Sequence, residues 1–235
     1  MIHHSIDNTQ RKAALIAGLM FLFVIVGSML YMSFVRPKLI LPMDAAATAV
    51  NIAAHALLFR AGTTFELLMA AGVIALAWAL WVLLKPVDKN LAALALCWRI
   101  AEGILWSGFA VLDHAALHIA SRDASGGGLE PGLQNALVGV VVRTMTVGMN
   151  IVVLFTGLGT IVFSYLLLKS RYVPWPLAAW GVLTYATMIL YSCAKLVVPS
   201  LAVHDLIVYT PGGIFEVVMG CQLVVIGVRA GAAAV

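Results

Sequence analysis

The chain has 235 residues, of which 63% are hydrophobic and only 10% are charged. Soluble domains carry about 25% charged residues, so this composition excludes a soluble globular protein and indicates a membrane protein with several spans. The net charge of +4 does not indicate nucleic-acid binding, because the basic residues stand at the ends of apolar runs and form no basic stripe.

Six apolar runs are long enough to cross a bilayer and predict an all-α, polytopic helix bundle in a single integral membrane domain, residues 1–235. The first run follows Arg11 and Lys12 but is too long for the apolar part of a signal peptide, so we interpret it as an uncleaved span. The predicted spans are residues 13–35, 63–84, 91–119, 134–168, 174–198 and 206–229.

The segment between the first two spans, residues 36–62, is too polar to cross the membrane. Asp44 is a good N-cap, and the residues after it predict a short helix that ends at Arg60, with Gly62 just beyond its end. We expect this helix to lie at the membrane interface or over the mouth of the bundle. It is either a plain surface helix or a lid over a binding site.

The distribution of Lys and Arg between the two ends of the spans predicts the orientation. The loop at residues 121–132 is glycine-rich and separates two halves of three spans each. With the N-terminus inside, seven basic residues lie on the inner side and four on the outer side, so both termini are predicted to be cytoplasmic. The inner set is Arg11, Lys12, Lys85, Lys89, Lys169, Arg171 and Arg229, and the outer set is Arg36, Lys38, Arg60 and Arg122.

Ionisable side chains within the spans are costly in lipid, so they are expected to face inward, to pair or to line a cavity. In the third span Arg99, Glu102 and Asp113 share one helical face, and Arg99 and Glu102 are spaced to pair along the helix. Similar polar stripes follow the fourth, fifth and sixth spans. These stripes predict one shared pocket in the outer half of the bilayer, opening outward.

The candidate ligand-binding residues are those of the polar stripes together with one acidic residue of the second span. The alternative is that the charges only fix the helix register, with Arg143 paired to Glu216, and Lys195 paired to Glu66 or Asp113. The full candidate set is Glu66, Arg99, Glu102, Asp113, Arg143, Asn150, Tyr191, Lys195 and Glu216.

The last span contains Gly213, Gly220 and Gly227 at intervals of seven residues, a seam of small residues suited to close helix contact. This seam is a candidate interface for a homo-oligomer. The preceding TPGG, residues 210–213, has two interpretations: a broken helix that lines a cavity, or an ordinary helix start with Thr210 as N-cap and Pro211 as the first residue.

His114 and His118 have the spacing that places two metal ligands on one helical face. A zinc site needs three or four ligands, and the three cysteines contain no CxxC pair to supply them. We therefore predict no cofactor and retain zinc at these histidines only as a weaker alternative.

Three stretches resemble a bacterial integral membrane family described as domain of unknown function 4386: VRPKLILPMDAAATAVNIAAHALLFRAG, ALWVLLKPVDKNLAALALCWRIAEGIL and GGIFEVVMG. The resemblance implies a multi-span protein of a bacterial inner membrane and no established activity. Arg143, Lys195 and the stretch from Asp113 to His118 depart from the family pattern. Family-like positions are Asp44, Asn51, Arg60, Pro86, Arg99 and Glu216.

The favoured hypothesis is a non-enzymatic protein that binds or moves a small amphipathic or anionic molecule, with Arg143 and Lys195 as its cationic groups. A second hypothesis is a membrane-embedded enzyme in which a buried carboxyl, or zinc, acts on a lipid or isoprenoid-like substrate. A third is a structural subunit of a membrane complex. The expected partners are membrane lipids and a small amphipathic ligand. The carboxyls considered as general acids are Glu66, Glu102, Asp113 and Glu216.

Overall fold

The computed structural model describes residues 6–41, 43–121 and 129–229, and these residues form helices with no strand among them. Within this part of the chain six helices are long and apolar enough to cross a membrane, which confirms the six predicted spans and a multi-pass membrane protein. Arg122, counted above for orientation, lies outside the described residues, as does most of its loop. The spans are Asn8–Leu39, Ala56–Leu84, Lys89–Ala120, Pro131–Ser170, Trp175–Val197 and Pro199–Ile226.

Two spans are composite, because short segments of different helical pitch extend them. The first joins α1 to α2 through the π-helical turn η1, and the last joins the 3₁₀ turn η3, α8 and the π-helical turn η4. The elements are α1 Asn8–Leu30, η1 Tyr31–Val35, α2 Arg36–Leu39, α3 Ala45–Ala54, α4 Ala56–Leu84, α5 Lys89–Ala120, α6 Pro131–Ser170, α7 Trp175–Val197, η3 Pro199–His204, α8 Asp205–Cys221 and η4 Gln222–Ile226.

The short helix between the first two spans begins as predicted but ends earlier. The Asp44 carboxylate caps α3 by accepting the backbone N–H of Ala47 at 2.8 Å. The helix stops at Ala54, and the residues predicted to complete it, up to Arg60, belong to the transmembrane α4. The predicted end was wrong because Gly62 does not terminate a helix: a Cβ at that position would lie 3.0 Å from the Tyr31 ring, so the glycine allows α4 to approach η1 closely.

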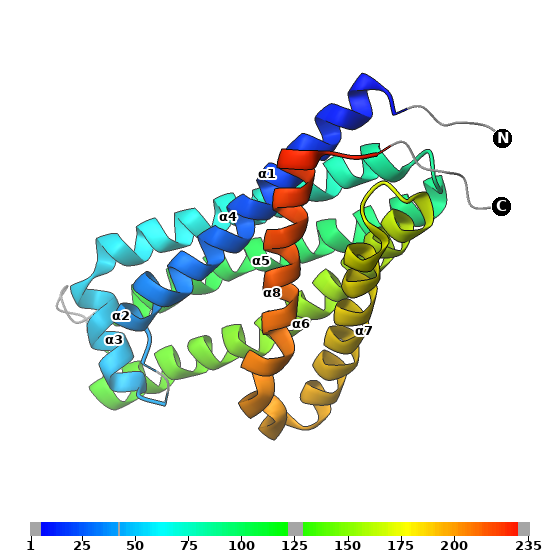
Figure 1. Ribbon diagram of the computed structural model, residues 1–235. Helices are drawn as coiled ribbons and strands as arrows, with labels where there is room; N and C mark the ends of the chain where they lie inside the picture. Colours follow the sequence, from blue (N-terminus) through cyan, green and yellow to red (C-terminus); the bar gives the residue numbers. More distant parts are fainter. Residues whose placement is uncertain (1–5, 42, 122–128, 230–235) are drawn as a thin grey trace.

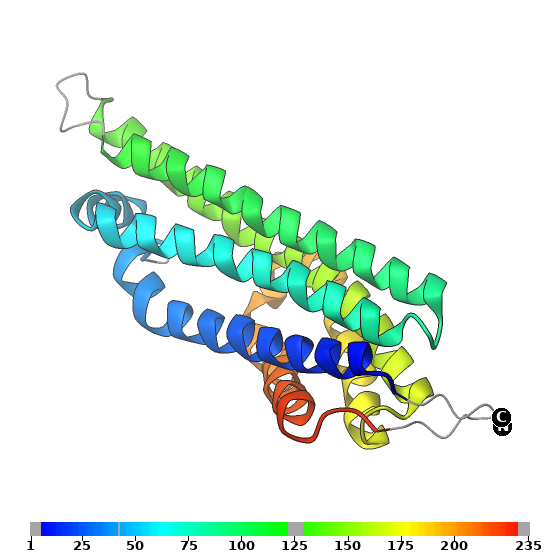
Figure 2. The same ribbon diagram turned by 90° about the horizontal axis from the view of Figure 1, so that it is seen from above.

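The six spans form a closed ring in chain order (Figures 1 and 2). Each of α1, α4, α5, α6, α7 and α8 packs against its neighbour along the chain, and α8 returns to pack against α1. The α3 helix packs on α5 and α6 at the end of the bundle opposite the N-terminus. We call this the distal end, and the end that holds the start of α1 the N-terminal end.

Two glycines allow the ring to close. A Cβ on Gly18 of α1 would lie 2.9 Å from the carbonyl oxygen of Gly220 on α8, and a Cβ on Gly220 would lie 3.2 Å from that of Gly18. The two backbones therefore touch at this crossing. From it, α1 and α8 diverge toward the distal end (Figures 1 and 2).

The main apolar core fills the N-terminal end of the ring. Its fully buried members include Leu76, Leu83, Phe163 and Met219, from three different spans. A hydrogen-bond network closes the same end: the Gln10 side-chain amide donates to the carbonyl of Leu83 at 3.2 Å and contacts the Tyr172 hydroxyl at 3.3 Å. The backbone N–H of Arg229 donates to the carbonyl of Tyr172 at 3.0 Å. The C-terminal segment is therefore attached to the same network.

Neither interpretation of the TPGG segment holds. The α8 helix begins at Asp205 and runs without a break to Cys221, so Pro211 is an internal residue rather than the first one. Asp205 favours this earlier start, because an acidic side chain stabilises the positive end of a helix dipole. Pro211 has no backbone N–H, so the carbonyl of Ile207, four residues before it, lacks its helical donor. In the same turn Thr210 donates its hydroxyl to the carbonyl of Leu206.

The contact between α1 and α8 predicts that Gly18→Ala destabilises the protein, because the added methyl group meets backbone and cannot be accommodated by a side-chain rotation. Overpacking of this kind costs about 1–3 kcal/mol. Gly108→Ala on α5 is the matched control: no atom of the described residues lies within 4 Å of its Cβ position. Thermal unfolding in detergent should show a lower Tm for Gly18→Ala and an equal or higher Tm for Gly108→Ala. Equal Tm values for both variants would contradict the backbone contact.

Candidate functional site

A cavity of about 490 Å³ lies inside the ring, on the distal side of the apolar core. Its volume is within the range of small-molecule sites in proteins. Every span contributes to its wall. Met32 and Thr146 are lining residues that are also exposed, so the mouth of the cavity lies between η1 and α6. The polar and charged lining residues are Ser28, Arg36, Glu66, Thr146, Asn150, Tyr185, Lys195, Asp205, Tyr209 and Glu216.

Most of the remaining wall is apolar and rich in methionine. Four methionines contribute to it: Met32, Met145, Met149 and Met188. Methionine side chains are unbranched and polarizable, so a surface built from them adapts to ligands of different shape. The cavity therefore combines a pliable apolar wall with a few charged groups at defined positions.

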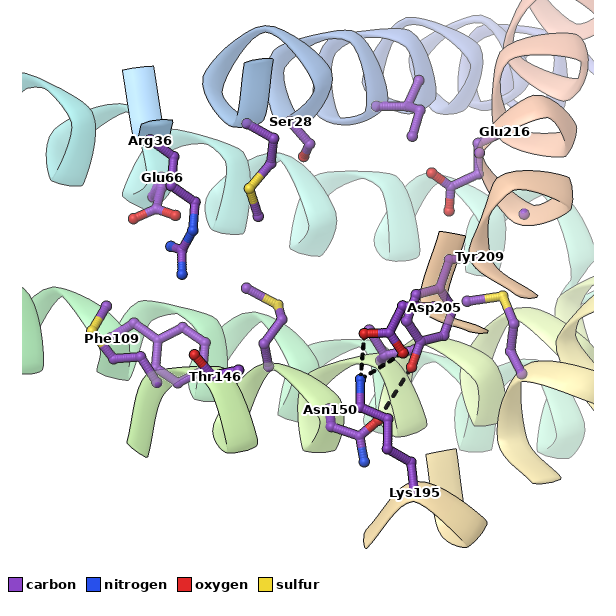
Figure 3. Close-up of a pocket in the computed structure, with 18 of the residues that line it drawn as sticks. Ser28, Arg36, Glu66, Phe109, Thr146, Asn150, Lys195, Asp205, Tyr209 and Glu216 are labelled. Atoms are coloured by element: carbon purple, nitrogen blue, oxygen red, sulfur yellow. Dashed lines mark hydrogen bonds and ion pairs between the residues drawn. The ribbon is translucent and has the colours of Figure 1, made fainter. Parts of the chain in front are cut away.

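Lys195 is held by a residue that the sequence analysis did not select. Its ammonium group lies 2.7 and 2.8 Å from the two carboxylate oxygens of Asp205, at the start of α8 (Figure 3). The Tyr191 hydroxyl donates to the same carboxylate at 2.8 Å and contacts the carbonyl of Leu201 at 2.6 Å. The predicted partner of Lys195, Glu66 or Asp113, is therefore wrong: its partner is the first residue of the next helix.

Asn150 connects α6 to both of the following helices. Its side-chain amide donates to the carbonyl of Ser192 at 2.9 Å, and its carbonyl oxygen accepts the Tyr209 hydroxyl at 3.2 Å. The Tyr209 ring also meets the Tyr191 ring edge-on, with centroids 5.5 Å apart. Because the amide of Asn150 is already engaged on both sides, this residue positions α7 and α8 more than it offers a free group to a ligand.

Glu66 and Arg36 lie together at one end of the cavity, and Glu216 lies at the other (Figure 3). Among the described residues Arg36 forms no ion pair with Glu66 or Asp113. Asp113 itself is buried behind this end and accepts the Thr63 hydroxyl at 2.8 Å. Arg36 was missed because the sequence analysis placed it in the polar connection after the first span, whereas α2 extends that span beyond it.

Glu216 faces the cavity from α8 and accepts the Tyr185 hydroxyl at 2.8 Å. The predicted pair of Arg99 and Glu102 is confirmed, with a nitrogen-to-oxygen distance of 2.7 Å, and both side chains are buried. Arg99 also reaches the Thr160 hydroxyl at 3.4 Å. These two residues lie among the packed helices and are not part of the cavity wall.

Arg143 does not reach this cavity. It is exposed on α6 and lines a separate small hollow beside α3, together with Asp44, Thr48 and Gly139. The predicted pairing of Arg143 with Glu216 is therefore wrong. Arg143 shares a helical stripe with Thr146 and Asn150. Because α6 has 40 residues, different parts of this stripe face different neighbouring helices.

The two histidines and the glycine seam are also placed. His114 and His118 are exposed on α5, and the described residues contain no group of three or more His, Cys, Asp or Glu side chains positioned to hold a metal. Gly220 packs on α1 inside one chain, Gly213 lines the cavity, and Gly227 follows η4 with φ of 72°. The close contact expected of the seam is thus made within the chain, and a homo-oligomer through it stays a prediction.

Besides Glu216, two side chains of α8 belong to the site and were missed by the sequence analysis, those of Asp205 and Tyr209. Asp205, Tyr209, Gly212 and Glu216 follow one another at intervals of four, three and four residues, which places them on one helical face. This spacing was readable, but the predicted sixth span began at residue 206 and excluded Asp205 by one position.

The carboxyl groups differ in what they can do chemically. Glu102 is bound to Arg99, and Asp113 is bound to Thr63 behind the wall, so neither is available to a molecule in the cavity. Glu66 and Glu216 do line it. Of the four carboxyls considered as general acids, Glu66 and Glu216 are therefore the two that can act on a molecule in the cavity.

The network around Asp205 predicts that Asp205→Asn destabilises the protein, because the partly buried ammonium of Lys195 loses its counter-charge. Hydrogen bonds to charged groups contribute about 1.5–3 kcal/mol. Thermal unfolding of Asp205→Asn, Lys195→Met and the double variant should show coupling between the two positions. Arg143→Gln is the control for loss of a charge outside this network, and its Tm should stay close to that of the unchanged protein. Additive losses in the double variant would contradict the pairing.

No curated protein and no solved structure was found to match the chain. The family model described as Domain of unknown function (DUF4386) matches residues 16–227. This range contains all six spans in whole or in large part and every residue that lines the cavity. The chain therefore belongs to the family described as domain of unknown function 4386.

Proposed function

We propose that this protein resides in a bacterial inner membrane and binds a small amphipathic molecule in the cavity, either to hold it or to move it. The observation that carries the proposal is the composition of the wall, which combines four methionines and other apolar residues with charged groups at separated positions. An amphipathic molecule can place its apolar body against the methionines and its polar head against the charged groups.

The geometry favours an amphipathic ligand over a simple anion. An anion site required Arg143 and Lys195 as free cationic groups. Arg143 lies in another hollow, and the charge of Lys195 is balanced by Asp205 at 2.7 Å. The remaining arginine of the wall, Arg36, lies beside Glu66. Each cation of the wall thus has an acidic neighbour.

The distribution of basic residues supports an orientation with both termini in the cytoplasm. Seven basic residues that flank the spans lie at the N-terminal end of the bundle, against three described ones at the distal end, namely Arg36, Lys38 and Arg60. Positively charged loops stay on the cytoplasmic side. In this orientation the cavity lies in the outer half of the membrane.

A variant that fills the cavity without disturbing the helices tests the proposal. Gly213 lines the cavity, and a Cβ there would meet only the Ile25 methyl group, at an ordinary contact distance of 3.6 Å. Gly213→Phe should therefore fold normally and occupy the binding space. Gly108→Phe, which adds the same ring away from the cavity, is the matched control.

The measurement is isothermal titration calorimetry in lipid nanodiscs with three probes that share an octyl chain: octyltrimethylammonium, octyl sulfate and octyl glucoside. At least one probe should bind the unchanged protein and Gly108→Phe, and its affinity for Gly213→Phe should fall about tenfold or more, the equivalent of about 1.4 kcal/mol. If no probe distinguishes Gly213→Phe from Gly108→Phe, the cavity is not a binding site for amphipathic molecules.

Reporter fusions test the orientation. Green fluorescent protein at the C-terminus should be fluorescent, and alkaline phosphatase at the same position should be inactive, because the first matures in the cytoplasm and the second only outside it. Alkaline phosphatase inserted after Leu129, between α5 and α6, should be active. The reverse pattern would place the cavity in the inner half of the membrane.

A further inference from the structure

The charges that face the cavity do not balance, and the imbalance identifies the kind of head group that would fit. Two basic and three acidic side chains contribute to the wall: Arg36, Lys195, Glu66, Asp205 and Glu216. With all five ionised the wall carries one net negative charge. This inference rests on the proposed function and concerns the chemical class of its ligand.

Glu216 is the acidic lining residue with no basic lining residue beside it. Lys195 and Asp205 neutralise each other through two short contacts, of 2.7 and 2.8 Å. At the far end Glu66 has Arg36 beside it. Among the described residues two ion pairs form inside the spans, Lys195 with Asp205 and Arg99 with Glu102, and neither Glu66 nor Glu216 takes part in them.

The surroundings of Glu216 supply a hydrogen bond but no free cation. Its partner is the neutral hydroxyl of Tyr185, at 2.8 Å. Arg99 is the cation whose charge acts on Glu216, but its guanidinium is held by Glu102 at 2.7 Å and stands outside the cavity wall. The carboxylate of Glu216 therefore faces an apolar cavity with its charge uncompensated from within.

The rest of the wall suits the same type of head group. The rings of Tyr185 and Tyr209 contribute to it, and aromatic faces attract ammonium groups. Tyr209 already receives one cation, since the Lys195 ammonium lies 5.5 Å from its ring centre. Methionine sulfurs add a polarizable surface without a positive charge that would repel an ammonium.

We propose that the ligand is an amphipathic organic cation, an amine or quaternary ammonium compound, whose positive head lies at Glu216 and whose apolar body lies along the methionine wall. The complementarity is between a carboxylate that lacks an internal counter-charge and a head group that provides one. A neutral or anionic amphiphile would gain the same apolar contacts but would leave the carboxylate buried and unpaired.

The octyl probes test this assignment with two further variants. Glu216→Gln removes the charge and keeps an acceptor for the Tyr185 hydroxyl, so the helix contacts are preserved. Glu130→Gln removes an exposed carboxylate before α6, outside the cavity, and is the matched control. Elution profile and Tm of each variant confirm that it is folded. Glu216→Asp keeps the charge on a shorter side chain and shows whether the preference follows the charge.

The unchanged protein and Glu130→Gln should bind octyltrimethylammonium at least about tenfold more tightly than octyl glucoside, and octyl sulfate most weakly. Glu216→Gln should lose most of this preference, and Glu216→Asp should keep it. Binding that depends on Gly213 but shows no preference for the cation, or a preference that survives Glu216→Gln, would overturn the assignment and leave the proposed function intact. If the affinity of none of the three probes is reduced by Gly213→Phe, the proposed function itself is refuted, and this result is separate from the one above.

Discussion

The backbone contact between Gly18 and Gly220 determines the form of this protein, because it closes six helices into a ring. The larger contacts between the other spans join neighbours along the chain, and these alone would pack the spans side by side in an open layer. Only the return of α8 to α1 encloses a space between them. Side chains at either glycine would hold the two helices apart, since a Cβ at Gly18 or Gly220 would lie 2.9 or 3.2 Å from a backbone oxygen of the opposite helix and 2.8 Å from a side-chain atom.

The same crossing explains why one end of the ring is solid and the other hollow. On the N-terminal side the helices stay close, and large residues such as Leu83 and Phe163 fill the centre. On the distal side α1 and α8 diverge, and the space is left to a methionine-lined cavity. The charges there follow a simple arrangement: Asp205 balances Lys195, Arg36 lies beside Glu66, and Glu216 has no basic lining residue beside it.

The sequence was sufficient for the class of fold and for part of the site. Apolar run lengths predicted all six spans, and the spacing of Arg99 and Glu102 predicted their pair, because both depend only on local helical geometry. Partners across helices were not predictable in this way. Lys195 pairs with Asp205, which lies one residue before the predicted start of the sixth span, and Arg143 lies beside α3. These contacts depend on the tilt and rotation of each helix, which are set by packing and cannot be deduced from residue spacing.

The central claim is that the distal half of the ring holds an amphipathic molecule at Glu216. Cryo-electron microscopy of the protein in nanodiscs with octyltrimethylammonium, using a rigid binding partner to aid alignment, tests it most directly. The account predicts elongated non-protein density along Met149 and Met188, with its head beside the Glu216 carboxylate. A cavity closed by α8 moving against α6, or density that places the head group at Lys195, would contradict it.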